Sequence, residues 1–109
     1  MIRLTGVYRI ESGTFGELDR MSDQIMQALM LNDSVIGPDI AVSLEESTFQ
    51  IEMVIDTEDP WKAATIGEKA IRLAFGVASI EPPHQSRFVA HRDLLLPTPV
   101  KVETVLVDA

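Results

Sequence analysis

The sequence contains no cysteine among its 109 residues. Disulfide bridges, thiolate metal sites and cysteine nucleophiles are therefore excluded, and this composition is typical of a cytoplasmic protein. A chain of 109 residues has the length of one domain and can bury a core without covalent staples.

Basic residues are also scarce, since nine Lys and Arg stand against 17 Asp and Glu and give a net charge of −8. A charge of this sign repels phosphate backbones, and no basic stripe offsets it. No segment approaches the ~20 continuous apolar residues of a spanning helix, and the first residues lack the apolar core of a signal peptide. We therefore expect neither nucleic acid nor a membrane as a partner, and solubility explains the charge.

Four segments alternate apolar and polar side chains with a period of two, which predicts strands with one buried face and one wetter face. They are residues 2–11, 39–45, 49–56 and 87–91. The polar turn at Glu46-Ser47 joins the second and third of them as a hairpin. Residues 100–107 form a fifth strand-like run beyond Pro97 and Pro99.

Two helices are predicted between these strands. Thr14 and Glu17 form a capping box ahead of an apolar stripe that includes Leu18 and Ile25. Asp59-Pro60 is typical of a second helix start. The stripe that follows consists of small residues: Ala63, Gly67, Ala70, Ala74 and Val77. A glycine inside a helix costs about 1 kcal/mol relative to alanine, so Gly67 predicts close packing.

The order of elements predicts an α+β fold, a ferredoxin-like βαββαβ sandwich with a four-stranded antiparallel sheet, two helices on one face and an extra C-terminal strand. We expect residues 1–96 to form this domain. Residues 97–109 are expected to be an extension that packs on its own or a partner's sheet edge. Ile40, Val42 and Leu44 are among the residues expected to face the helices.

The opposite side of the sheet, which we call the open face, mixes charged and apolar side chains. Such a surface is common in dimers and ligand platforms. The candidate ligand or interface residues on it are Arg3, Arg9, Glu52, Arg87 and His91. Its other residues are Thr5, Val7, Ala41, Ser43, Gln50, Val54 and Val89. We therefore expect a homo-oligomer, in the first place a dimer, and a small-molecule ligand is a further possibility.

Candidate chemistry is sparse. His84 and His91 are the two histidines, and their spacing without a third ligand predicts no metal site. His91, beside Glu52 or Arg9, is the candidate general base, although a lone surface histidine specifies little. The free amides at Ser12-Gly13-Thr14 are explained by helix capping, and no phosphate-binding loop is present. We expect no cofactor.

Gly16-Glu17-Leu18, followed by Met21, Ile25 and Leu29, resembles the first loop and helix of ACT regulatory domains. Those domains share the βαββαβ order and bind amino acids at domain interfaces. The resemblance covers residues 15–29, and Phe15 stands where those domains usually carry proline. It implies a fold, and a shared fold does not imply a shared function.

Three functions are compatible with these features. The favoured one is a non-catalytic oligomeric module for assembly or small-ligand binding. The second is a small enzyme of the dimeric α/β-barrel kind that uses the open face around His91. The third is an acidic adaptor that docks on a basic protein partner.

Overall fold

The computed structural model describes residues 1–10, 15–83, 85–92 and 101–108. In chain order they form β1 (Ile2–Arg9), α1 (Phe15–Met30), β2 (Ile36–Ser43), β3 (Thr48–Ile55), α2 (Pro60–Val77), β4 (Gln85–Arg92) and β5 (Lys101–Asp108). The predicted order of strands and helices is confirmed, and the ends of the elements differ from the expected ones by a few residues. The α+β class is therefore correct.

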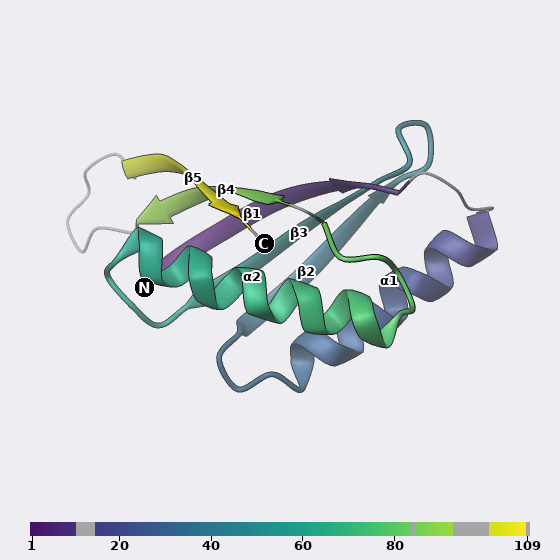
Figure 1. The fold of residues 1–109 in the computed structure, drawn as a ribbon, viewed down its shortest axis with the longest axis horizontal. Coiled ribbons are helices and arrows are strands. Elements are labelled where there is room, and N and C mark those ends of the chain that lie inside the picture. Colours follow the sequence, from purple (N-terminus) through teal and green to yellow (C-terminus); the bar gives the residue numbers. More distant parts are fainter. Residues whose placement is uncertain (11–14, 84, 93–100, 109) are drawn as a thin grey trace.

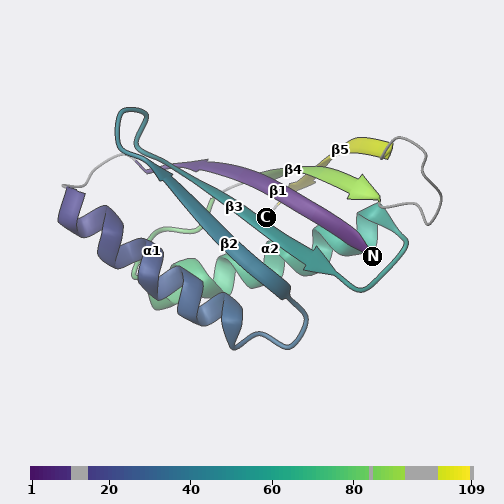
Figure 2. The same ribbon diagram turned by 180° about the vertical axis from the view of Figure 1, so that it is seen from behind.

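The strands form one five-stranded antiparallel sheet in the order β2-β3-β1-β4-β5. In Figures 1 and 2, which view the molecule from opposite sides, both helices lie below the sheet. β5 pairs with β4 of its own sheet, from Gln85 opposite Asp108 to Arg92 opposite Lys101. The division of the chain at residue 96 stays a prediction.

The core lies between the helices and one face of the sheet. Ile2, Leu4 and Tyr8 alternate with more exposed residues along β1, and β3 buries its apolar residues in the same way. A Cβ atom on Gly67 would lie 2.7 Å from Leu4 Cδ1. Glycine thus lets α2 lie directly on β1, which confirms the close packing predicted for this position.

Helix α2 begins as the sequence predicts. The side chain of Asp59 accepts a hydrogen bond from the Trp61 amide at 3.0 Å, and Pro60 occupies the first turn. The predicted cap of α1 involves Thr14, which lies outside the described residues, as do His84 and residues 94–96.

Val42 and Leu44, which were expected to face the helices, are both exposed. Val42 lies opposite the buried Phe49 and so faces the helices, yet it is 38% exposed. Leu44 lies in the turn after β2 and is also exposed. The reason is that β2 is an edge strand, so the helix layer covers its side chains only in part.

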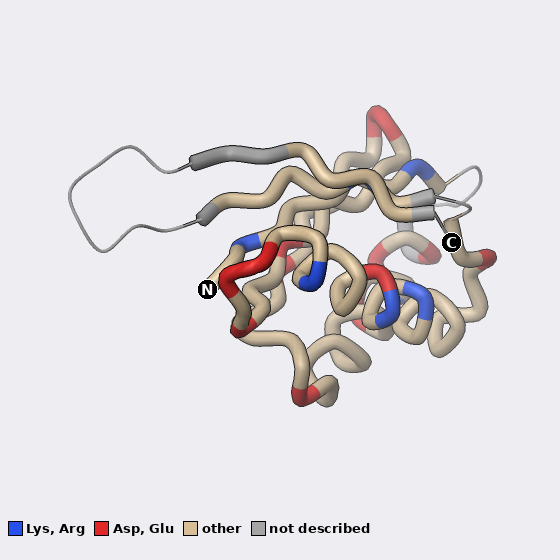
Figure 3. The backbone as a smooth tube through the Cα atoms, turned by 60° about the vertical axis from the view of Figure 1, so that its left-hand side comes forward, with Lys and Arg blue, Asp and Glu red and all other residues tan. Residues whose placement is uncertain are grey.

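Acidic side chains lie mainly outside the sheet. Figure 3, which colours the backbone by residue type, shows Asp and Glu positions on the helices and connecting loops, whereas β1 to β4 carry Asp39 and Glu52 as their acidic residues. No helix in the described part of the chain is long and apolar enough to cross a membrane. The expected cytoplasmic location stays a prediction.

Candidate functional site

The strand register places all five candidate residues on the open face. Arg3 lies opposite Val54 on β3 and opposite His91 on β4, and Glu52 lies opposite Thr5. Arg9 and Arg87 have the same face as Arg3 and His91, because alternate residues of a strand point to the same side. Both helices lie on the other side of the sheet (Figure 2).

Three of the five candidates lie together, and two lie apart. Arg3 Nε is 3.7 Å from Glu52 Oε1, and His91 is directly opposite Arg3. Arg9 is six residues from Arg3, or about 20 Å along the strand, and Arg87 is about 13 Å from His91. The register of β1 with β3 and β4 therefore gathers Arg3, Glu52 and His91 but leaves the two other arginines at a distance.

The Arg3–Glu52 pair is a surface contact. Both side chains are more than a third exposed, so solvent screens their attraction and the pair is worth at most about 1 kcal/mol. Glu52 also lies opposite Asp39 of β2, a like charge that Arg3 offsets. Arg3, Glu52 and Asp39 thus form a row of charges on the surface of the sheet.

Apolar side chains lie between these charges. Val7, on the central strand β1, is 61% exposed. Leu106 of β5 and Ile36 of β2 are also exposed, and the register puts both on this face, opposite Arg87 and Val54 respectively. The open face therefore presents apolar residues across the width of the sheet.

A second polar group lies in the core and was not predicted. Glu68 of α2 is buried, and within the described chain neither of its carboxylate oxygens accepts a hydrogen bond. The Tyr8 hydroxyl donates to Ser86 Oγ at 3.3 Å, and the Tyr8 ring packs edge-on against Phe75 at 5.3 Å. Two buried hydroxyls and a buried carboxylate thus occupy the space between α2 and the sheet.

Arg72 connects this buried group to the surface. Its Nη1 lies 3.6 Å from Glu68 Oε1 and donates to the Pro83 carbonyl at 3.0 Å. Glu68 therefore positions a cation that ties α2 to the segment before β4. The signal in the sequence is a lone carboxylate directly after Gly67 on the buried side of the helix, where Ala64, Ile71 and Phe75 also lie.

Burial raises the pKa of Tyr8 well above its usual range. The hydrogen bond with Ser86 opposes this rise in pKa, and the negative charge of Glu68 adds to it. A buried phenol that resists ionisation is the expected result of desolvation, because a low dielectric disfavours the charged form. Tyr8 therefore acts here as a neutral hydrogen-bond donor.

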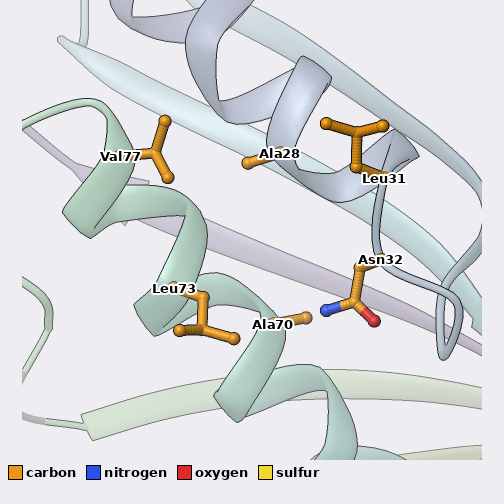
Figure 4. A pocket seen from close by; sticks show the side chains of 6 residues that line it. All are labelled: Ala28, Leu31, Asn32, Ala70, Leu73 and Val77. Carbon is orange, nitrogen blue, oxygen red and sulfur yellow. The ribbon is translucent and has the colours of Figure 1, made fainter.

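A shallow groove of about 300 Å³ lies between the helices, away from both polar groups. Figure 4 shows Ala28 of α1 and the following Leu31 on one side, and Ala70, Leu73 and Val77 of α2 on the other. Asn32 is the sole polar residue in its lining. The groove offers apolar contact and has no titratable group for catalysis.

Among the described residues, no three His, Cys, Asp or Glu side chains are grouped so that they could hold a metal ion. A scan against models of known protein families finds no match, and a search among curated proteins finds none.

Proposed function

We propose that this protein is a non-catalytic assembly module that associates with a second copy of itself through the open face of its sheet. The observation that carries the proposal is Val7, a large aliphatic residue at the middle of an uncovered sheet face with 61% of its surface exposed. Contact with a second open face would remove this apolar surface from water, at roughly 25 cal/mol per Å².

The proposal includes the finer fold assignment, a ferredoxin-like sandwich with a fifth strand added at one edge. Two features support it. The first four strands run antiparallel in the order β2-β3-β1-β4, and both helices lie on the same side of them. Packing of two open sheets face to face is a common way for layered folds to bury their second face.

The charge distribution supports contact between two like faces. By register, the described open face holds three arginines and three carboxylates: Arg3, Arg9, Arg87, Asp39, Glu52 and Asp108. The whole chain carries a net charge of −8, so the remaining surface is strongly acidic. Two open faces can therefore meet without the like-charge repulsion that two other surfaces of this chain would suffer.

The test is the mass of the protein in solution before and after Val7→Lys. A lysine at this position puts a charge in the middle of the proposed contact, and we expect the mass to fall by half. Leu73→Lys is the matched control, because Leu73 is exposed to a similar extent, 67%, but lies on the helix layer. A fall in mass with Leu73→Lys alone would move the contact to the helices and contradict the proposal.

A further inference from the structure

The two edges of the sheet differ in their capacity to accept another strand. At the β2 edge the register shifts between Ile36 and Asp39, and Gly37 has a positive φ of 54°. Pro38 has no amide hydrogen, and the Ile40 amide donates to Asp39 Oδ1 at 3.0 Å. Bulges and proline are the devices by which proteins block sheet edges, so the β2 edge is blocked.

The β5 edge has neither a bulge nor a proline. All eight residues of β5 pair with β4 in one uninterrupted register, and the strand contains neither proline nor glycine. β5 is the last strand of the sheet, so within the described chain its outer edge has no partner strand. Val105 is only 2% exposed and belongs to the hydrophobic core. The strand is therefore held in place, with a regular row of backbone groups facing outwards.

We propose that β5 pairs along this edge with β5 of a second copy, antiparallel and centred on the strand, so that one sheet continues through both chains. Two identical strands that meet around a two-fold axis are self-complementary, since each backbone donor of one faces an acceptor of the other. This contact goes beyond the open-face association and does not rest on it.

The flank of α2 adds to the area of this contact. A stable dimer needs about 800 Å² from each partner, which a strand edge by itself does not supply. Trp61 shares a side of α2 with Glu68 and Arg72, because they lie about two and three turns further along the helix. Ala70, Leu73 and Val77 of α2 line the groove against α1. They lie about 150° around the helix from Trp61, so this side of α2 faces away from α1. Trp61 is 63% exposed, and an aromatic side chain of this kind buries roughly 150–250 Å².

Single cysteines test the contact, because the chain has no cysteine of its own. A two-fold axis at the centre of β5 passes through Thr104 or Val105. In the first case two copies of residue 104 lie opposite each other, and in the second Thr104 lies opposite Leu106 of the other copy. Opposite Cα atoms in a sheet are about 4.5–5.5 Å apart, within the range of a disulfide.

If the axis passes through Thr104, we expect oxidation to link Thr104→Cys alone into a covalent dimer. If it passes through Val105, we expect the link in an equal mixture of Thr104→Cys and Leu106→Cys. The control is Ala41→Cys, which is exposed on the same face of the sheet but on the blocked β2 edge. It should not form a link under the same conditions. The proposal is overturned if neither β5 sample forms a link, or if Ala41→Cys does so equally.

Adding Val7→Lys to the cysteine variants separates this contact from the open-face association. Val7 lies on β1, two strands from the β5 edge. The edge proposal predicts that the link forms at an unchanged rate in the presence of Val7→Lys, even if the open-face association is lost. Loss of the link with Val7→Lys would mean that it came from contact between open faces, and it would overturn the edge proposal alone.

Discussion

Replacing Gly67 and Gly76 by alanine, one at a time, measures how closely α2 lies on the sheet. Alanine stabilises a helix by about 1 kcal/mol relative to glycine, and both positions lie in α2. At Gly76 a Cβ atom would meet nothing within 4 Å. Gly76→Ala should therefore raise the free energy of unfolding by up to about 1 kcal/mol. The gain is smaller if helix propensity counts for less in the last turn of α2, where Gly76 lies.

At Gly67 the same Cβ atom would lie 2.7 Å from Leu4 Cδ1 and 3.5 Å from Phe88 Cζ. Both neighbours are buried and have little room to move, and overpacking of this kind costs about 1–3 kcal/mol. The gain in helix propensity offsets part of the cost. We therefore expect Gly67→Ala to be less stable than Gly76→Ala by about 1–3 kcal/mol.

The assay is urea unfolding of both variants at one protein concentration, because association makes apparent stability depend on concentration. The slope of the free energy against urea should be the same for both variants, which shows that the folded states are equally compact. Equal midpoints for Gly67→Ala and Gly76→Ala would refute the close contact between α2 and β1.

Two further predictions concern the polar groups. Tyr8 is the sole tyrosine, so its phenolate absorbance should appear only well above pH 10, its ordinary pKa. Stability should fall as pH rises above about 10, because the unfolded state then loses a proton that folded Tyr8 keeps. Tyr8→Phe should remove this loss of stability at high pH. Glu68→Gln should lower the pKa of Tyr8. Ionisation of Tyr8 near pH 10 in the folded protein would contradict the burial of its hydroxyl. A double-mutant cycle on Arg3 and Glu52 should give a coupling free energy below about 1 kcal/mol, and this value should decrease as salt is added. A larger coupling free energy that does not depend on salt would show that the pair is not a surface contact.

Periodicity in the sequence was sufficient to predict the elements and their faces. The alternation along residues 2–11 correctly separated the buried Leu4 and Tyr8 from the exposed Val7, because the face of a strand residue depends only on whether its position is odd or even. The coverage of each strand depends on where the helices lie. For that reason Val42 faces the helices as expected but stays exposed, because β2 is at the edge of the sheet.

The candidate site was predictable in part for the same reason. Odd and even positions placed Arg3, Arg9 and His91 on one face, but their separation depends on the register between β1 and β4. That register is a tertiary property and left Arg9 far from His91. The buried carboxylate of Glu68 was missed because the small residues alone were taken as the buried stripe of α2, and the carboxylate next to Gly67 was not placed on the same side.

Sedimentation equilibrium of the native chain and of Val7→Lys measures whether the open face binds a second copy. We expect the native chain to be an oligomer at high micromolar concentration and Val7→Lys to have half its mass. A native chain that is monomeric at that concentration, or a Val7→Lys variant with unchanged mass, would contradict this expectation.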